Sequence, residues 1–210
     1  MKLCVIGGAG ARSAFLTKSL VKSARDIRVD HIVLLDNDQQ KLKTYGEISR
    51  ELARRLDPEL TFEVTSDARA ALTGVDYIIT TIRAGGDAGR LFDEQTCLAH
   101  GVLGQETTGA GGFAMAIRSV PTLVYYCTLA REVANPGHLI FNFTNPSGII
   151  TQALRSKGFD NVYGICDAPS GFIKQLEEIL DIPYGTLDIE CYGLNPVSYT
   201  HLTLPPILRV

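Results

Sequence analysis

Short apolar runs alternate with helical patterns along most of the chain, and this alternation constrains the fold more than any other feature. The expected strands lie at 2–6, 31–35, 61–65, 77–81, 138–143 and 162–165. Apolar residues at three- and four-residue spacing indicate helices at 12–23, 37–56, 91–99, 113–133, from 147 onward and at 170–180. Strands connected through helices of this length pair in parallel by right-handed crossovers. We therefore expect an α/β fold with a doubly wound, mainly parallel sheet that binds ligands at the carboxyl ends of its strands.

The bulk composition is that of a soluble globular chain. Its 210 residues are 45% hydrophobic and 20% charged, which is enough for one full core. The net charge of −3 gives no reason to expect nucleic acid or an anionic membrane as a partner. A strand directly after Met1 argues against a signal peptide, and no apolar run approaches the roughly 20 residues that span a bilayer. We expect a cytoplasmic protein with neither kind of partner.

The cysteines point to the same compartment. They form an odd set without CxxC spacing, namely Cys4, Cys97, Cys127, Cys166 and Cys191. Cys4 lies in an expected core strand and Cys127 in an apolar helix, where a thiol acts as a small hydrophobe. Reduced cytoplasmic thiols are therefore expected.

A glycine cluster follows the first expected strand and precedes the first expected helix. Gly7, Gly8 and Gly10 would let the backbone approach a pyrophosphate, and the helix start would supply N–H donors. The strict G-x-G-x-x-G spacing is not met. Asp36, at the end of the second strand, stands where an acid binds ribose hydroxyls, and a carboxylate there favours NAD over NADP. A strand-to-helix turn without a cofactor remains the alternative.

Two arginines follow the expected strand at 77–81. Arg83 and Arg90 would lie at the ligand-binding edge, where a guanidinium group donates two hydrogen bonds to a phosphate in a fixed fork. We expect both to recognise phosphate groups and assign Arg83 to the cofactor. Solvated arginines are commoner in general, so their position carries this interpretation.

Two further polar residues are candidates for the site. Glu106 lies in the segment 104–112, where four glycines indicate backbone that a ligand or partner approaches closely, or a mobile surface loop. Asn145 stands before Pro146, after the expected strand at 138–143. Its amide would bind sugar hydroxyls or cofactor, or would cap the next helix.

Cys166 and Asp167 stand side by side after the expected strand at 162–165. A thiolate is a soft metal ligand, and the neighbouring carboxylate would act as an acid or as a second ligand. A divalent metal needs more ligands, typically a histidine, and no histidine lies at a metal-like spacing from Cys166. The histidines are His31, His100, His138 and His201. A buried structural cysteine remains an equal alternative.

The end of the chain breaks the alternation. Residues 187–194 are expected to form a last strand, but 196–210 contain three prolines and show neither a helix nor a strand period. We expect a nucleotide-binding domain over 1–195 and a foreign or frame-shifted tail over 196–210. A disordered terminus is the alternative.

Taken together, these segments resemble glycoside hydrolase family 4, the NAD- and Mn²⁺-dependent glycosidases. The motifs that carry the resemblance occur in order at 5–8, 82–86, 104–109, 142–146, 164–169 and 192–195. Together, these motifs are highly specific for that family. The resemblance implies a Rossmann-like domain and an enzyme of the 6-phospho-β-glucosidase type, although no residue here decides between the two anomers.

The resemblance also implies roles for individual residues. Cys166 matches the metal-binding cysteine, and Asp167 matches the acid that protonates the leaving group in the α-type enzymes. Arg90 matches an arginine on the phosphate side of the substrate, and Asn145 matches a substrate-binding asparagine. Glu106 matches a glutamate that supports the catalytic base. The glycine-rich loop and the acid after the second strand would hold NAD.

The mechanism implied by the resemblance differs from ordinary hydrolysis by two carboxylates. NAD⁺ takes hydride from C3 of the sugar, and the metal polarises the resulting ketone. A tyrosine base then removes the C2 proton, and the aglycone leaves C1 by elimination. Water adds and the hydride returns, so no net redox change occurs.

Two departures from the family pattern restrict what this chain would do by itself. Pro196 stands where family members carry the histidine that completes the metal site, and His201 is out of register. Members are also longer, and their second half supplies the tyrosine base and dimer contacts. We therefore expect an amino-terminal half, impaired by itself, of a homo-oligomeric enzyme for a phosphorylated glucoside. An NAD-dependent 2-hydroxy acid dehydrogenase and a non-catalytic NAD-binding module remain alternatives.

Overall fold

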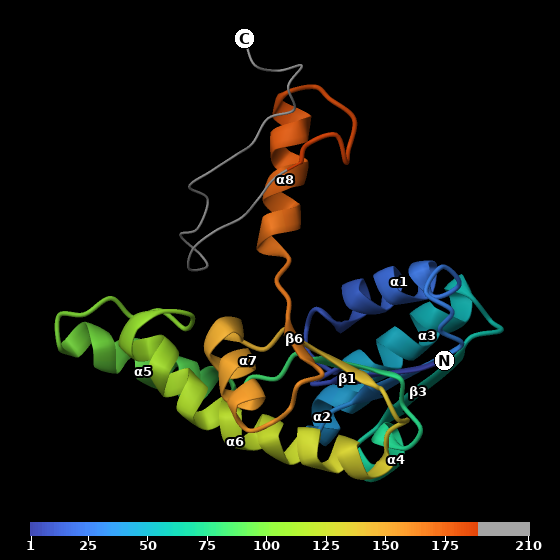
Figure 1. Ribbon diagram of the computed structural model, residues 1–210, viewed down its shortest axis with the longest axis horizontal. Coiled ribbons are helices and arrows are strands. Elements are labelled where there is room, and N and C mark those ends of the chain that lie inside the picture. The colour runs from blue at the N-terminus through green and yellow to red at the C-terminus, as the bar shows by residue number, and fades with distance from the viewer. Residues whose placement is uncertain (189–210) are drawn as a thin grey trace.

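The computed structural model describes residues 1–188, and its centre is a parallel sheet (Figure 1). In these residues the sheet has six strands in the order β3-β2-β1-β4-β5-β6. Their bounds are Lys2–Ile6 (β1), His31–Leu35 (β2), Thr61–Thr65 (β3), Tyr77–Thr80 (β4), Leu139–Asn142 (β5) and Val162–Gly164 (β6). The chain moves outward from β1 to β3, returns to β4 beside β1, and moves outward again to β6. This order confirms the predicted doubly wound, Rossmann-like sheet.

Helices connect the successive strands. The first half contains α1 (Ser13–Ser23), α2 (Gln39–Lys41), the π-helical segment η1 (Leu42–Gly46), α3 (Glu47–Leu56) and α4 (Ala68–Leu72). The second half contains α5 (Gly86–Ala99), α6 (Gly109–Val133), α7 (Ser147–Ser156) and α8 (Ala168–Ile179). Parallel strands need such crossovers, because each strand must be entered from the same edge of the sheet.

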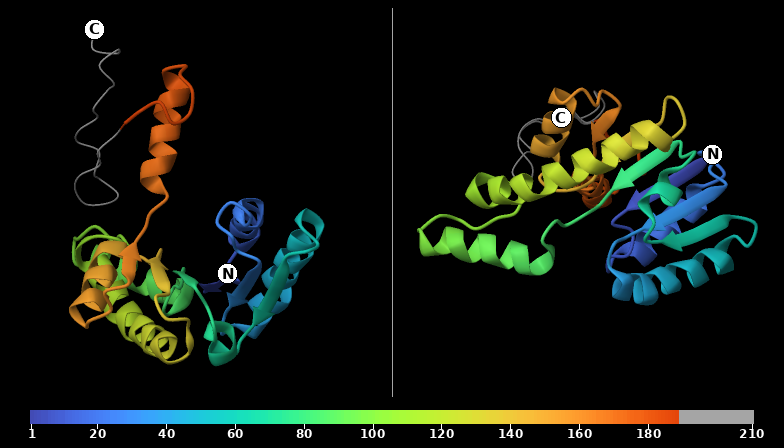
Figure 2. Two further views of the ribbon diagram at one scale, coloured as in Figure 1. Left: turned by 45° about the vertical axis from the view of Figure 1, so that its right-hand side comes forward. Right: turned by 90° about the horizontal axis from the view of Figure 1, so that it is seen from below.

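The helices pack on both faces of the sheet, as Figures 1 and 2 show. On one face, α1 and α3 cover a cluster that includes Leu3, Val5, Val21, Ile32, Leu34 and Ala53. On the opposite face, α4, α6 and α7 cover a second cluster that includes Cys4, Val33, Leu72, Ile78, Leu123 and Ile150. Successive side chains of a strand point to opposite faces, so β1 contributes alternate residues to the two clusters.

The two central strands form the most buried part of the molecule. In β1 and β2 every residue after the first is buried, because helices cover both faces. Burial of a Val, Leu or Ile side chain contributes roughly 1.5–3 kcal/mol each. The loops at the carboxyl edge therefore leave from a rigid base.

Two helices begin earlier than the sequence pattern predicts. α5 begins at Gly86 rather than residue 91, and α6 begins at Gly109 rather than residue 113. A Cβ at Gly111 would lie 2.5 Å from the Gln105 carbonyl oxygen, so the chain's own backbone makes the close approach. Gly104, Gly111 and Gly112 therefore serve packing within the chain, whereas a Cβ at Gly109 would meet no atom within 4 Å, and approach by a ligand or partner stays a prediction. The short helix α4 is a further element that the pattern does not predict.

The predicted tail lies outside the described residues. So do all but the first two residues of the predicted strand at 187–194. Both therefore stay predictions.

Helix α6 corrects the expectation about apolar length. Its 25 residues make it long and apolar enough to cross a membrane by length and composition. Leu123 and Cys127 are, however, buried in the cluster beneath the sheet, and Arg118 forms an ion pair with Asp93. Core helices of soluble proteins satisfy the same two criteria, and we interpret α6 as a core helix.

Helix α8 leads away from the sheet (Figures 1 and 2). Glu177 is the buried residue of this helix. Its Oε1 accepts hydrogen bonds from the N–H groups of Gly185 at 2.8 Å and Leu187 at 3.0 Å. Glu177 therefore ties the turn after α8 back onto the helix.

Candidate active site

The loops that leave the carboxyl edge of the sheet carry the predicted site residues. Between β1 and β4 the winding direction reverses, which is where ligands of such sheets bind. The loops after these two strands are in contact, since a Cβ at Gly7 would lie 2.7 Å from the Thr81 carbonyl oxygen. The predicted nucleotide loop is therefore next to the strand end that leads to Arg83.

Gly7 and Gly8 are required by the packing of the loop itself. Their N–H groups both donate to the Leu35 carbonyl oxygen, at 2.8 and 3.0 Å. Gly7 has φ +82°, a conformation in which a side chain is strained. A Cβ at Gly8 would lie 2.9 Å from the Val5 carbonyl oxygen. These two glycines fix a tight turn between β1 and α1 whether or not a ligand is bound.

The residues after this turn are open instead. A Cβ at Gly10 would meet no atom within 4 Å. In the part of the chain that the structure describes, the N–H groups of Gly10, Ala11 and Arg12 donate no hydrogen bond. They stand at the start of α1, where N–H groups and the helix dipole attract anions. This arrangement fits the pyrophosphate of a dinucleotide.

Asp36 lies against this loop. Its Oδ2 accepts a hydrogen bond from the Ala9 N–H at 3.1 Å, and its Oδ1 accepts one from the Asp38 N–H at 3.0 Å. The residue is half-buried. A carboxylate offers about four acceptor positions, so positions remain for ribose hydroxyls. The glycine loop and the acid, which the sequence predicts separately, form one unit.

Arg83, Arg90 and Glu106 form a second group at this edge. Arg83 Nη1 donates to Glu106 Oε2 at 2.8 Å, and Arg90 Nη1 lies 3.8 Å from the same oxygen. Arg90 Nε donates to Glu94 Oε1 at 2.7 Å. The hydrogen bond to Glu94, and next the charge of Glu106, raise the pKa of Arg90. Glu106 thus holds two guanidinium groups near each other, an arrangement that suits phosphate recognition.

Arg118 of α6 contacts the segment that carries Arg83 and Arg90, a role that the sequence pattern does not predict. It donates from Nη1 to Asp93 Oδ1 at 2.8 Å and from Nη2 to Asp93 Oδ2. Its Nε donates to the Ala84 carbonyl oxygen at 3.3 Å. The hydrogen-bonded Asp93 raises the pKa of Arg118. A Cβ at Gly85 would lie 3.0 Å from the Arg118 Nε, so the glycine makes room for the ion pair.

Asp93 is 7% exposed, so this pair is largely removed from solvent. It joins α5 to α6 and fixes the turn from which α5 starts. One sequence signal for it exists: Arg118 is the only charged residue in the segment 109–130, and an arginine that packs in an apolar setting needs a carboxylate partner.

Asn145 leaves the carboxyl end of β5 through a cis peptide bond to Pro146. Helix α7 begins at Ser147 with Pro146 as its N-cap, and no side chain caps it. The helix-cap alternative for Asn145 is therefore wrong. Its half-buried side chain makes no hydrogen bond within residues 1–188. An unengaged amide at this edge fits a substrate contact.

Cys166 and Asp167 follow β6. Cys166 is half-buried and Asp167 is exposed at the start of α8. The Asp167 carbonyl oxygen accepts hydrogen bonds from the Ser170 hydroxyl at 3.0 Å and the Gly171 N–H at 2.9 Å. The Asp167 carboxylate makes no cap hydrogen bond, so it is available to a ligand.

Residues 1–188 do not complete a metal site around Cys166. No group of three or more His, Cys, Asp or Glu side chains in this range could hold an ion. His31 begins β2 and His138 precedes β5, so both lie at the opposite edge of the sheet. The chemistry of Cys166 suits a metal ligand, but one thiolate with one adjacent carboxylate is not a full ligand set.

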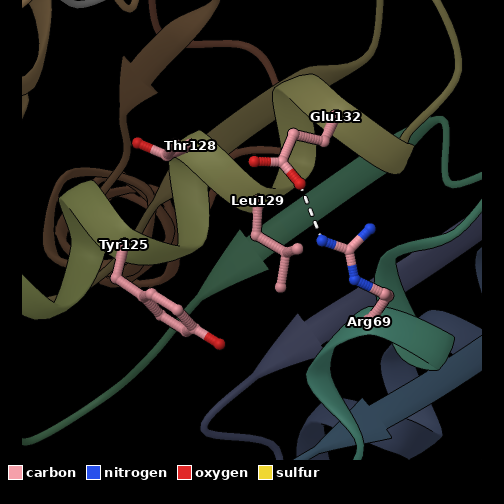
Figure 3. A pocket seen from close by; sticks show the side chains of 5 residues that line it. All are labelled: Arg69, Tyr125, Thr128, Leu129 and Glu132. Carbon is pink, nitrogen blue, oxygen red and sulfur yellow. Dashed lines mark hydrogen bonds and ion pairs between the residues drawn. The ribbon is translucent and has the colours of Figure 1, made fainter.

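A hollow of about 350 Å³ lies between α4 and α6 and is not the predicted site (Figure 3). It is lined by Arg69, Tyr125, Thr128, Leu129 and Glu132. Arg69 Nη2 lies 2.7 Å from Glu132 Oε2 across it, and both side chains are more than half exposed. None of its lining residues is among those predicted at the carboxyl edge.

Comparison with known proteins assigns the family. The sequence profile described as Family 4 glycosyl hydrolase matches residues 2–182. The 6-phospho-beta-glucosidase BglT of Thermotoga maritima is 34% identical over 200 residues, which are 95% of this chain and 47% of BglT. The chain therefore spans about half the length of the curated relatives it matches.

Two solved structures are similar over the same region. One is a 6-phospho-alpha-glucosidase from gut microorganisms, in complex with NAD and Mn²⁺. It matches with a TM-score of 0.86 at 32% identity, and the match includes 92% of this chain and 44% of the glucosidase chain. The other is the 6-phospho-beta glucosidase of Thermotoga maritima, with NAD and glucose-6-phosphate. It matches with a TM-score of 0.86 at 33% identity, and the match includes 94% of this chain and 47% of the glucosidase chain.

The dehydrogenase alternative receives support from the fold alone. A malate dehydrogenase from Naegleria fowleri has a TM-score of 0.71 but 13% identity, over 96% of this chain and 58% of its own. That likeness reflects the shared doubly wound sheet. The profile match covers most of the chain and agrees with the relatives above, so the chain belongs to family 4 of the glycosyl hydrolases.

Proposed function

We propose that the protein hydrolyses 6-phospho-glucosides as a 6-phospho-β-glucosidase, with NAD and Mn²⁺ as cofactors, and that residues 1–195 are its nucleotide-binding domain. One observation carries the proposal. The glycine loop touches, through Gly7 and Thr81, the strand end that leads to Arg83. A dinucleotide loop and a pair of arginines thus share one edge of the sheet. The matched relatives named above are 6-phospho-glucosidases of both anomeric types.

The loop after β1 would bind NAD and select it over NADP. The N–H groups of Gly10, Ala11 and Arg12 are placed to donate to the pyrophosphate. Asp36, held beside the loop by the Ala9 N–H, accepts from the ribose hydroxyls and repels a 2′-phosphate. Bound NAD⁺ supplies the hydride acceptor for the sugar.

The arginine group would bind the anionic parts of cofactor and substrate. Arg83 serves the cofactor side and Arg90 the substrate phosphate, and Glu106 fixes the spacing between them. In this arrangement Glu106 supports the reaction through the arginines that it holds. The Asn145 amide orients sugar hydroxyls. The exposed Asp167 carboxyl is the acid that would protonate the leaving-group oxygen of an α-anomer, the role that the resemblance gives it.

Cys166 is the metal ligand that this part of the chain would contribute. The described residues do not complete a ligand set, so the remaining ligands would come from other residues. We infer further that the protein is a cytoplasmic homo-oligomer. The chain by itself turns over poorly, because it corresponds to about half of BglT.

The test is hydrolysis of the two nitrophenyl 6-phosphoglucoside anomers by a full-length protein that carries this sequence. Nitrophenol release is expected from one anomer and should require both NAD and Mn²⁺. Activity that persists after chelation and cofactor removal would contradict the proposal. Steady accumulation of NADH with malate or lactate would instead indicate a dehydrogenase.

A matched pair of variants locates the phosphate contact. Arg90→Met should raise KM for the phosphorylated substrate by about tenfold or more, because a charge-assisted contact is lost. Arg55→Met removes an arginine that is 72% exposed and pairs with Glu51 on α3, and it should leave KM unchanged. Equal effects of the two substitutions would exclude Arg90 from the phosphate site.

A further inference from the structure

Asn142 is a fully buried amide at the end of β5, at a strand position where the fold alone would accept an apolar side chain. It is 0% exposed. Its Oδ1 accepts from the Thr80 hydroxyl at 2.9 Å and from the Thr144 N–H at 3.3 Å. Its Nδ2 donates to the Thr151 hydroxyl at 3.1 Å and to the Ser147 carbonyl oxygen at 3.3 Å. Both ends of the amide are therefore satisfied inside the protein.

These contacts reach the loop after β4. Thr80 is the last residue of β4, and its hydroxyl binds Asn142 directly. The Thr144 hydroxyl, which lies 3.4 Å from the Thr80 hydroxyl, accepts a hydrogen bond from the Ile82 N–H at 3.0 Å. Ile82 immediately precedes Arg83. The position of the arginine loop is thus linked to the amide on β5.

The main chain of the same residue, independently of its side chain, reaches the loop after β6. The Asn142 carbonyl oxygen accepts hydrogen bonds from the Ile165 N–H at 3.0 Å and from the Ser147 hydroxyl at 3.1 Å. Ile165 immediately precedes Cys166. A Cβ at Gly164 would lie 2.8 Å from the Thr151 hydroxyl, so β6 and α7 meet without space for a side chain.

Burial of this polar group has a cost that packing does not require. A buried amide that loses its hydrogen bonds is destabilising, and a buried network is favourable only when every member is satisfied. A leucine at this position would fill similar volume without that risk. The network instead specifies one mutual arrangement of the ends of β4 and β5 and the start of α7.

We propose that the Asn142 side chain is a positioning group that sets Arg83 and Asn145 relative to one another. This inference rests on the proposed function, because it assigns the loops after β4 and β5 to the phosphorylated sugar and to the nicotinamide side of the cofactor. The proposed site for the adenosine half of NAD is the glycine loop and Asp36 after β1 and β2, to which the Asn142 side chain makes no hydrogen bond. A positioning role therefore predicts that loss of the Asn142 side chain weakens binding of the sugar phosphate but not of the adenosine half of the cofactor.

The experiment compares two ligands on the 210-residue chain by calorimetry, glucose 6-phosphate and ADP-ribose. Asn142→Leu should raise the Kd for glucose 6-phosphate by about tenfold, which corresponds to about 1.4 kcal/mol of binding free energy. The Kd for ADP-ribose should stay unchanged. Thr80→Val, which removes one hydroxyl from the network, should act in the same direction. Thr80→Ser keeps the hydroxyl and should restore binding.

Thr17→Val is the matched control. Thr17 is 0% exposed in α1, and its hydroxyl has no hydrogen-bond partner in the described residues. The same substitution there should change neither affinity. The proposal would be overturned if Asn142→Leu lowered the affinity for both ligands equally, or if Thr80→Ser and Thr80→Val had the same affinities. Either result would mean that the network only stabilises the fold.

Amide hydrogen exchange separates failure of this inference from failure of the proposed function. The Ile82 amide should lose protection in Asn142→Leu and Thr80→Val. The amides of β1 and β2 should keep theirs, and so should the Ile165 amide, whose bond to the main-chain carbonyl oxygen of residue 142 is retained. If the unmodified chain binds no glucose 6-phosphate, the proposed function loses support, and exchange alone decides the role of Asn142. Unchanged protection of Ile82 would then overturn it.

Discussion

At the scale of single residues, depth in the fold decides what a cysteine can do. Cys4 and Cys127 are 0% and 1% exposed and lie in the cluster between the sheet and α6. Burial raises the pKa of both thiols from 9.0 to about 12, because the thiolate would lose its hydration. Cys166 is half-buried at the carboxyl edge. The buried pair acts as core side chains, and Cys166 is the candidate ligand.

The two buried thiols predict a loss of stability in alkaline solution. Their folded pKa exceeds the unfolded value of 9.0, so their contribution is complete below pH 9 and is lost as pH rises through 9 toward 12. Each thiol should remove about 1 kcal/mol from the free energy of unfolding between pH 8 and 10. Urea denaturation over this range measures it. A Cys4→Ala/Cys127→Ala variant should lose less, and an equally steep loss would refute the thiol origin.

At the scale of elements, close backbone contacts decide where α6 begins. Gly111 and Gly112 are buried in its first turns, against the segment that carries Glu106. Any side chain at these positions would meet backbone atoms of Gln105 or Thr107 at 2.5–2.7 Å. The start of α6 is therefore coupled to the placement of Glu106, and through it to the arginine group.

Gly111→Ala tests this coupling. The substitution should lower the free energy of unfolding by about 1–3 kcal/mol, because the added methyl group overlaps the Gln105 carbonyl oxygen. Gly148→Ala in α7 is the control, since its Cβ would meet no atom within 4 Å. It should stabilise the chain by about 0.4–1 kcal/mol through helix propensity. The same sign for both variants in thermal or urea unfolding would contradict the close-contact argument.

At the scale of the whole molecule, the doubly wound sheet gathers distant segments at one edge. Asp36, Arg83, Glu106 and Asn145 come from loops that follow different elements, yet parallel strands with buried centres bring these loops to the same side. A ligand bound there contacts both halves of the domain. Ligand binding and global stability are consequently linked.

NAD should therefore raise the Tm of the chain. At a concentration about 100 times its Kd, a ligand adds about 2.7 kcal/mol, or roughly 5–10 °C for a domain of this size. NADP at the same concentration should give a smaller shift, because Asp36 repels the 2′-phosphate. Differential scanning fluorimetry measures both. In Asp36→Ala the two shifts should become similar, whereas an unchanged preference would assign the discrimination to another residue.

Local pattern predicted the strands well, because buried parallel strands are short apolar runs with glycine or helix signals on either side. The helix starts at Gly86 and Gly109 were harder, since a glycine in a first turn looks like a loop until its neighbour is known. The candidate residues at strand ends followed from topology and from the resemblance to a known family. Their partners did not: Arg118 and Asn142 have no local signature strong enough to reveal Asp93 or Thr80.

The sequence by itself determined the winding of the sheet, the glycine-rich turn after β1 and the edge at which we propose that ligands bind, because these depend on short-range periodicity and on the identity of residues at strand ends. Only the tertiary structure decided that Glu106 pairs with Arg83 and that Asn142 joins the loops after β4 and β6. Those contacts join residues 23 and 62 positions apart. They form where packed elements bring polar groups together in a buried or half-buried setting. The spacing of residues along the chain does not predict such contacts.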